Sequence, residues 1–428
     1  MHNSRLAALK ILNNYKPRST NLSSLINETL EKYSDMNDKG FSRSLVWGTV
    51  RYLNTLDYVI DLFLKKPAGT SAKIRNILRL GVYQLLYLEE NIPSYAVVNE
   101  SVEMAKNTGI EYAKGLVNGV LREVLRKKED IKYPSNNDAK SITIEYSHPQ
   151  WLVSRWINRF GKERTTNLCK ANNIAPELCI RANLLKISRE DLKKELEKED
   201  VASIETKYSP DGLILSRNPE IEKLSAYRNK YFMVQDEASQ VVSRVLDPKE
   251  NETILDVCCG SGAKTTHIAQ ISGNKTKIIS VDNSQNQLDK LSKNLKMFGA
   301  QNARIVNDDA KNIKNIKADR ILFDSPCSGI GVIRRKPDIK WNRNEADITH
   351  KYPGLQKEIL FSLPGLLKPG GVLVYSTCSI EPEENENVIN DFLDKFKEFT
   401  LEDTRFPKTF YPDEHGTDGF YIAKLKMN

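Results

Sequence analysis

The chain has 428 residues, 39% of them hydrophobic and 28% charged, a composition typical of a folded protein with two or three domains. Its net charge of +8 suits a protein that binds a polyanion equally well as one with a lysine-rich surface. No run reaches the ~18 apolar residues of a membrane span, the first residues show no secretion signal, and the six cysteines and five histidines lack zinc-site spacing. We therefore expect a cytoplasmic protein with no metal, no disulfide framework and no membrane contact.

Residues 1–130 are predicted to be helical throughout. Apolar residues recur at helical spacing in several runs, among them 6–12 and 74–86. Prolines and glycines such as Pro67 and Gly109 separate the runs, and strand-like alternation is absent from the sequence. The pattern indicates an all-α domain of five to seven helices.

The middle of the chain has a mixed pattern. A polar segment rich in helix breakers, 127–145, is predicted to be a linker. Beyond it, residues 146–235 combine short strand candidates, such as 177–182, with an amphipathic helix over 188–199. We interpret 146–235 as a small α+β module.

Residues 236–428 alternate between short apolar strands and helices. Strands are predicted at 254–258, 278–282, 304–306, 321–324 and 372–377, and helices at 264–271, 285–298 and 353–367. Such alternation is typical of βαβ units, which build a parallel, doubly wound, Rossmann-like sheet. In sheets of this kind ligands bind at the carboxyl ends of the strands.

The first of these strands runs into a glycine-rich turn. The turn consists of Cys258, Cys259, Gly260, Ser261, Gly262, Ala263 and Lys264. Glycines there let the backbone approach a ligand closely. A dinucleotide fingerprint would need glycine where Thr265 stands, and a phosphate loop would need its lysine directly after a glycine. Both of these alternatives fail on the residues.

A site for S-adenosyl-L-methionine (SAM) fits better. Asp282 closes the next strand, where a carboxylate can accept both ribose hydroxyls. Asp308 and Asp309 follow the third strand and could contact the adenine; we assign Asp309, although either residue could serve. A nicotinamide enzyme is disfavoured because the strand-end loops offer no histidine or tyrosine for hydride transfer.

Two later strands end in cysteine motifs. Asp324 and Cys327 follow one strand, and Cys378 follows the other. Because the carboxyl ends of parallel strands open on one crevice, we expect these three residues to converge. A single cysteine would more simply be a buried packing residue, but two at strand ends beside an acid indicate chemistry.

One acid and two thiols suit methylation of cytosine at C5. A thiolate that adds to C6 makes C5 nucleophilic enough to take a methyl group from a sulfonium. A carboxyl group near N3 stabilises the charge on the ring, and a base must then remove the C5 proton before the thiol leaves. From the residues alone, either cysteine could be the nucleophile.

Two longer motifs resemble the Nop2/Sun class of RNA cytosine-5 methyltransferases. They are Asp-Ser-Pro-Cys-Ser at 324–328, followed by Gly-Val-Ile-Arg-Arg-Lys-Pro-Asp-Ile-Lys-Trp at 331–341, and Ser-Thr-Cys-Ser-Ile-Glu-Pro-Glu-Glu-Asn at 376–385. The resemblance covers residues 145–428, and residues 1–130 are similar to a NusB-type RNA-binding domain. It implies a multidomain protein with an all-α NusB-like N-terminal domain, a small α+β RNA-binding or linker module, and a C-terminal α/β Rossmann-like SAM-dependent methyltransferase domain.

The resemblance also implies roles and a substrate, a cytosine of 16S rRNA. Cys378 would be the nucleophile, Cys327 would assist product release, Asp324 would contact both the cofactor and the base, and Lys264 would hold the cofactor or substrate side of the pocket. The family usually has Cys-Ala-Ala-Pro-Gly-Gly-Lys in the turn. This chain keeps Gly262 but lacks the proline and one glycine.

A basic segment follows the Cys327 motif and is predicted to contact RNA. Its residues are Arg334, Arg335, Lys336, Lys340 and Trp341. Cations can follow phosphates and an aromatic ring can stack on a base, although an exposed loop with Trp341 as a packing anchor is the alternative. The target cytosine must leave any stack to reach a thiol, so we expect an unpaired or flipped-out base.

Other functions stay open at this point. A methyltransferase of the same chemistry could act on another RNA or on DNA, and a non-catalytic rRNA-binding assembly factor could keep the fold. We expect a monomer that acts on 16S rRNA.

Overall fold

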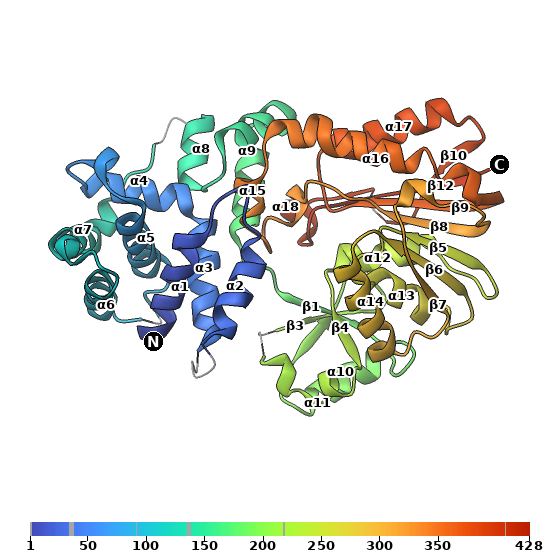
Figure 1. Cartoon of the computed structure of the whole chain (residues 1–428), viewed down its shortest axis with the longest axis horizontal. Coiled ribbons are helices and arrows are strands. Elements are labelled where there is room, and N and C mark those ends of the chain that lie inside the picture. The colour runs from blue at the N-terminus through green and yellow to red at the C-terminus, as the bar shows by residue number, and fades with distance from the viewer. Residues whose placement is uncertain (1, 34–37, 91, 135–137, 217–218, 407) are drawn as a thin grey trace. The chain divides into compact units, whose positions relative to one another are not determined.

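The computed structural model describes residues 2–428 apart from 34–37, 91, 135–137, 217–218 and 407. It divides into two compact units (Figure 1). Unit 1 comprises Met1–Ile174 and Arg335–Asn344, and unit 2 comprises Ala175–Arg334 and Glu345–Asn428. Within the described residues, no helix combines the length and the apolar character needed to cross a membrane.

Unit 1 is helical in its described residues. Its α-helices are α1 (His2–Asn14), α2 (Leu22–Glu31), α3 (Lys39–Arg51), α4 (Leu53–Phe63), α5 (Ala72–Tyr87), α6 (Ser94–Asn107), α7 (Lys114–Lys127), α8 (Ala139–Glu145), α9 (Gln150–Asn173) and α15 (Ile339–Asn342). Side-chain caps satisfy backbone N–H groups at several starts; Asp38 Oδ1, for example, accepts from Phe41 N at 2.7 Å. The predicted all-α domain is confirmed.

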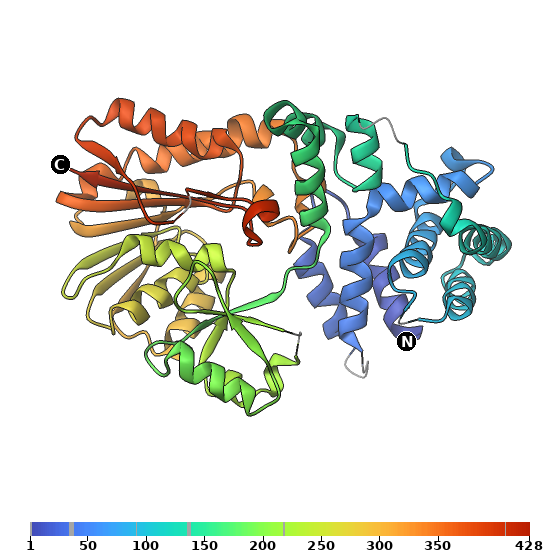
Figure 2. The same cartoon turned by 180° about the vertical axis from the view of Figure 1, so that it is seen from behind.

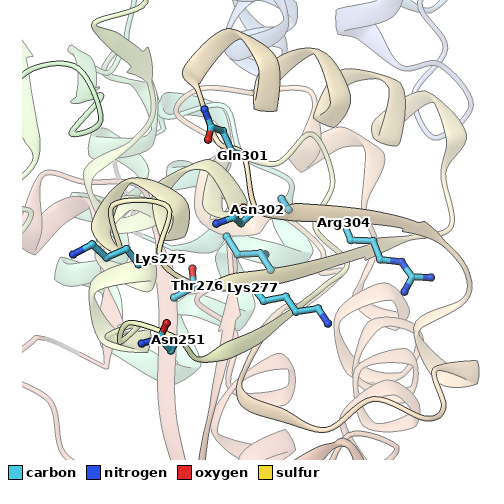
Figure 3. A pocket seen from close by; sticks show the side chains of 9 residues that line it. Asn251, Lys275, Thr276, Lys277, Gln301, Asn302 and Arg304 are labelled. Atoms are coloured by element: carbon cyan, nitrogen blue, oxygen red, sulfur yellow. The ribbon is translucent and has the colours of Figure 1, made fainter.

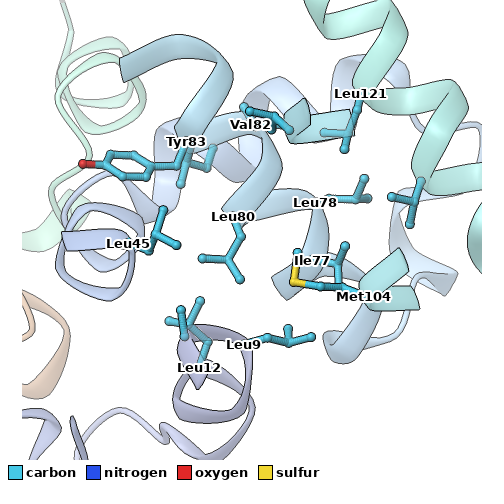
Figure 4. Close-up of a cluster of buried hydrophobic side chains, with 14 of the residues drawn as sticks. Leu9, Leu12, Leu45, Ile77, Leu78, Leu80, Val82, Tyr83, Met104 and Leu121 are labelled. Carbon is cyan, nitrogen blue, oxygen red and sulfur yellow. The ribbon is translucent and has the colours of Figure 1, made fainter. Parts of the chain in front are cut away.

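Helix α5 is the centre of the unit 1 core. Ile77, Leu78 and Leu80 are fully buried, and α5 packs against α1, α3, α4, α6 and α7. Figure 4 shows side chains from neighbouring helices, among them Leu9 and Leu121, around it. Burying each such leucine or isoleucine stabilises the unit by about 2 kcal/mol. A helix with apolar residues on most sides is stable only in this kind of interior position.

Residues 175–235 form a small antiparallel sheet in unit 2. Its strands are β1 (Leu178–Ala182), β2 (Ser203–Glu205), β3 (Gly212–Leu215) and β4 (Phe232–Val234), in the order β2-β3-β1-β4. Helices α10 (Arg189–Glu197) and α11 (Ser225–Arg228) pack against it through a shared apolar core. The α+β prediction is confirmed. Residues 146–174, which the sequence assigns to this module, lie in unit 1.

The rest of unit 2 is built on an eight-stranded sheet. Its strands are β5 (Thr253–Val257), β6 (Lys277–Asp282), β7 (Ala303–Asn307), β8 (Ala318–Asp324), β9 (Leu367–Thr377), β10 (Phe399–Glu402), β11 (Thr409–Phe410) and β12 (Phe420–Met427). The order is β10-β12-β9-β8-β5-β6-β7, with β11 paired to β12. Strands β5 to β9 pair in parallel as predicted, whereas β12 runs antiparallel to β9, β10 and β11.

Helices cover both faces of this sheet (Figures 1 and 2). They are α12 (Glu237–Leu246), α13 (Ala263–Ile271) and α14 (Gln285–Phe298) on one face, and α16 (Tyr352–Leu360) and α17 (Glu386–Lys395) on the other. Alternate residues of each strand feed the two apolar layers. In β5, for example, Ile254 packs with α12 and α13, and Leu255 packs with α16 and α17. The helix predicted at 353–367 is shorter than expected, since α16 ends at Leu360 and β9 begins at Leu367.

The sheet has its switch point between β5 and β8. From β5 the chain proceeds through β6 to β7 on one side, and then returns to place β8 and β9 on the other side. Crossovers that leave in opposite directions open a crevice at the carboxyl ends of the two central strands, which is where ligands bind in doubly wound sheets.

Candidate active site

The glycine-rich turn lies between β5 and α13 at this crevice. Cys258, Gly260 and Gly262 have φ of 59°, 54° and 83°, a backbone region that favours glycine. A Cβ built on Gly260 would meet no atom within 4 Å, so the turn borders open space that a ligand can fill. A Cβ on Gly262 would instead lie 2.1 Å from Leu291 Cδ1.

Asp282, at the end of β6, holds this turn in place. Its Oδ2 accepts a hydrogen bond from Gly260 N at 2.9 Å, and its Oδ1 accepts one from Ser284 N at 2.9 Å. The carboxylate therefore lies beside the turn, where the sequence predicts the ribose-binding acid. A carboxylate can accept hydrogen bonds from the ribose hydroxyls of SAM, and the open glycine turn leaves room for its amino-acid end, so these residues fit the cofactor.

Two further acids follow β7. Asp309 Oδ1 accepts from Lys311 N at 3.0 Å, and Asp308 Oδ1 accepts from Asp309 N at 2.8 Å. Both carboxylates thus lie at the same strand end, and their hydrogen bonds do not favour either one as the adenine contact. The assignment of Asp309 to the adenine stays a prediction.

Asp324 connects the cofactor turn with the end of β9. Its Oδ2 accepts a hydrogen bond from Lys264 Nζ at 2.6 Å, and its Oδ1 accepts one from Ser376 Oγ at 2.7 Å. Lys264 is 8% exposed and lies on the first turn of α13. Both carboxylate oxygens are therefore fixed from two sides, which sets the orientation of Asp324 in the crevice.

The two predicted catalytic cysteines meet at the same strand ends. Cys327 Sγ and Cys378 Sγ lie 2.9 Å apart, in the loops after β8 and β9. The hydrogen bond with Cys378 and the loss of water around the sulfur raise the pKa of Cys327 well above its usual value, so Cys327 stays a thiol at neutral pH. Burial likewise raises the pKa of Cys258 to about 12 and raises that of Cys259.

Two buried acids near the site were not predicted. Asp256, in β5, accepts from Thr265 Oγ1 at 2.5 Å, and burial raises its pKa to about 7. An acid inside an otherwise apolar strand was the signal that could have revealed it. Glu384, in the short helix η9 (Pro382–Glu384), accepts hydrogen bonds from Ser328 and Ser379, the residues that follow the two cysteines. Glu384 lies within the motif at 376–385, but nothing in that motif indicates its contact with Ser328.

Two cations of the basic segment that is predicted to contact RNA are buried. Arg334 is buried in unit 2, where its Nη1 donates to Gly416 O and Thr417 O. Lys340 is fully buried in unit 1 and donates to Arg51 O at 2.8 Å, which leaves its ammonium no path to a phosphate in this conformation. Of the remaining cations, Arg335 is half-buried and Lys336 is exposed.

Trp341 is a packing anchor, the alternative to an RNA contact that the sequence left open. Its indole Nε1 donates to Val50 O at 2.8 Å, and its ring packs against the unit 1 core. Residues 335–344 belong to unit 1 although they interrupt the sequence of unit 2. Trp341 therefore acts as a packing anchor, and RNA contacts at Arg335 and Lys336 stay predictions.

A second, basic pocket lies at the opposite edge of the large sheet (Figure 3). Lys275, Lys277 and Arg304 line it near the amino-terminal ends of β6 and β7. This pocket, at the amino-terminal ends of the strands, shares no lining residue with the crevice at their carboxyl ends that holds the turn, the acids and the two thiols. We therefore place the chemistry at the carboxyl ends of the strands.

The fold and the site together define a SAM-dependent methyltransferase. The central parallel strands, the glycine-rich turn after the first of them and the acids that close the next two provide a cofactor site. Beside it lies a pair of thiols.

Comparisons with known proteins identify the family. The model of the 16S rRNA methyltransferases RsmB/F matches residues 243–426, that of the NusB family matches 2–126, and that of the ferredoxin-like domain of RsmF/B-like methyltransferases matches 148–222. The chain is 34% identical to the probable ribosomal RNA small subunit methyltransferase B of Synechocystis sp., over 100% of both chains. It is 34% identical to ribosomal RNA small subunit methyltransferase B of Proteus mirabilis, over 99% of this chain and 98% of that one.

A solved structure supports the same conclusion. The crystal structure of NSun6 from Pyrococcus horikoshii with SFG matches with a TM-score of 0.60 and 29% identity, over 65% of this chain and 98% of that chain. The chain belongs to the RsmB/F family of 16S rRNA methyltransferases: it is an enzyme that uses SAM to methylate rRNA.

Gly262 provides a test of the cofactor turn. We expect Gly262→Ala to weaken SAM binding at least tenfold, because the new Cβ would overlap Leu291 and overpacking costs about 1–3 kcal/mol. Isothermal titration calorimetry with SAM measures the loss. Gly273→Ala is the matched control, since Gly273 also has a positive φ and no atom within 4 Å of the added Cβ but lies after α13, outside the cofactor turn. Equal affinities of the two variants would contradict this account of the turn.

Proposed function

We propose that the chain transfers a methyl group from SAM to C5 of a specific cytosine in 16S rRNA, through a covalent adduct between Cys378 and C6. The observation that carries this proposal is the pair of cysteine sulfurs 2.9 Å apart at the strand ends that also hold Asp324. Two thiols beside an oriented carboxyl group supply one nucleophile for C6 and a second group that can help to release it.

The proposed reaction proceeds in three steps. The Cys378 thiol gives up its proton to solvent and its sulfur forms a bond to C6, while the electrons of the C5–C6 double bond shift onto C5 and the conjugated ring, which makes C5 nucleophilic. When bound, SAM supplies an electrophilic methyl group on its sulfonium, which C5 takes. Loss of the C5 proton then restores the double bond, and the electrons of the C6–S bond return to Cys378.

Asp324 is the group that we assign to the cytosine ring. Lys264 and Ser376 hold its two oxygens at 2.6 and 2.7 Å, so the carboxyl group is oriented before the base arrives. A preoriented carboxyl group close to N3 can stabilise the charge that the ring acquires when Cys378 adds. Through Lys264, the same residue connects base recognition with the cofactor turn.

Cys327 is the group that we assign to release of the product. The hydrogen bond to Cys378 is the largest cause of the raised Cys327 pKa. Once the Cys378 sulfur is bonded to C6, this contribution to the raised Cys327 pKa is weakened, although burial still raises the pKa. Cys327 can then lose its proton to solvent and accept the C5 proton, after which its S–H can donate to the departing Cys378 sulfur.

We further propose a division of labour along the chain. Residues 1–130 would hold RNA, residues 146–235 would bind RNA or link the flanking domains, and residues 236–428 would carry the reaction. Arg335 and Lys336 would contact phosphates near the target.

Nucleoside analysis tests the proposed reaction. The purified chain would be incubated with 16S rRNA and methyl-labelled SAM, and the RNA would be digested and separated by liquid chromatography with mass spectrometry. We expect label in 5-methylcytidine. Label in another nucleoside, or on another RNA or DNA alone, would overturn the assignment of substrate. RNA binding without label would favour an assembly factor.

A further inference from the structure

We propose that Glu384 is a positioning residue that holds the two cysteine loops together and so sets the distance between Cys327 and Cys378. The inference rests on the proposed roles of the two thiols, but it concerns a side chain outside them. Glu384 lies in the same connection between β9 and α17 as Cys378, at the end of the short helix η9, and its side chain is fully buried.

The carboxylate contacts both cysteine loops at once. Its Oε2 accepts from Ser328 N at 2.7 Å and its Oε1 accepts from Ser328 Oγ, directly after Cys327. Its Oε1 also accepts from Ser379 Oγ at 2.7 Å, directly after Cys378. One rigid, planar group therefore spans the residues that neighbour both thiols, and both serines are fully buried with it.

Neighbouring contacts hold Glu384 itself in place. Tyr375 OH donates to Glu384 O at 2.6 Å, which ties its backbone to β9. Gln356 Nε2, from α16, donates to Pro326 O at 3.0 Å and to Glu384 Oε2 at 3.3 Å. The backbone of Glu384 is thus tied to β9 and its carboxylate to α16, so the carboxylate has little freedom to follow a loop that moves.

The physical need for such a residue follows from the geometry of the reaction. Where the sheet ladder ends, two backbone hydrogen bonds join the loops after β8 and β9, Ser325 N to Ser376 O at 2.8 Å and Gly331 N to Cys378 O at 3.0 Å, and neither involves Cys327. The hydroxyl oxygens of Ser328 and Ser379 also lie 3.4 Å apart. Two thiols that act in turn on one base must stay within about 3–3.5 Å of their targets. A carboxylate that accepts from both loops fixes this relation without touching the base.

Oxidative cross-linking measures the distance directly. Diamide takes two electrons and two protons from a pair of thiols, and it closes a disulfide fastest when the two sulfurs are already in contact. In the full chain we expect rapid formation of the Cys327–Cys378 disulfide, detected by peptide mass spectrometry. We expect Glu384→Gln to slow this closure at least fivefold, because an amide offers only one acceptor oxygen to the four donors.

Methyl-transfer kinetics provide a second readout. Glu384→Gln should lower kcat roughly tenfold to hundredfold, as for misplacement of a reacting group by about 1 Å, and should leave KM for rRNA and the Kd for SAM within twofold of wild type. The matched control is Glu386→Gln, the same substitution two residues on, whose carboxylate accepts from Thr409 Oγ1 instead. It should cross-link and turn over like wild type.

The outcomes separate this inference from the proposed function. Wild-type cross-linking and kcat in Glu384→Gln would overturn the positioning role, whatever the cysteines do. Should Glu384→Gln fail to fold, the double variant Ser328→Ala/Ser379→Ala removes the two hydroxyl donors instead, and unchanged cross-linking there would equally overturn it. The proposed function fails by a different result, namely methyl transfer by a chain without Cys378.

Discussion

Cys378→Ala is expected to lower the rate of methyl transfer to 16S rRNA by a factor on the order of 10⁴ or more. Without a thiol at C6, C5 of cytosine lacks the electron density to attack a sulfonium methyl group, and no other step in the site replaces it. Transfer of labelled methyl groups from SAM to 16S rRNA measures the rate. SAM affinity should stay within a few-fold of wild type, because the cofactor turn and Asp282 are untouched.

A second cysteine variant controls for the removal of a thiol as such. Cys179→Ala changes a buried cysteine of the small module and should keep the wild-type rate in folded protein. Substantial methyl transfer by Cys378→Ala would refute the assignment of the nucleophile. Inactivity of Cys327→Ala without an adduct, together with an active Cys378→Ala, would reverse the two roles.

Cys327→Ala is expected to trap the enzyme on its substrate. If Cys327 accepts the C5 proton and assists departure of the Cys378 sulfur 2.9 Å away, its removal stops the reaction after methyl transfer but before release. The covalent complex should then accumulate to a large fraction of the enzyme. A denaturing gel would show it as an RNA-dependent band of lower mobility.

The double variant is the control for this adduct. Cys327→Ala/Cys378→Ala should give no shifted band, because it has no sulfur to bond to C6. The division of labour between the thiols would be refuted by a Cys327→Ala enzyme that turns over freely, or by a shifted band that persists in the double variant.

Local sequence patterns predicted most of the catalytic fold. Short apolar runs in the sequence predicted the strands β5 to β9. The glycines of the turn predicted a tight loop after β5, and Gly260 and Gly262 do adopt the positive φ that favours glycine. The meeting of Asp324 with the thiols follows from the rule that parallel strands open on one edge. The antiparallel β12, which lies between β9 and β10, could not be predicted in this way, since nothing local in a strand specifies the direction of its partners.

Long-range packing explains what the sequence did not reveal. Lys340 and Trp341 lie in a basic segment that looks exposed, but the segment belongs to unit 1, where the two side chains bond to backbone carbonyls of α3. No periodicity within ten residues encodes that partner. Glu384 is similar, because its role depends on two serines that are five and 56 residues away in sequence.

Bisulfite sequencing of small-subunit rRNA tests the central claim most directly. Bisulfite deaminates cytosine but not 5-methylcytosine, so a protected cytosine marks the product. The account predicts that cells lacking this chain lose protection at one cytosine of 16S rRNA, that the wild-type chain restores it, and that the Cys378→Ala chain does not. Identical protection with and without the chain, or restoration by Cys378→Ala, would contradict it.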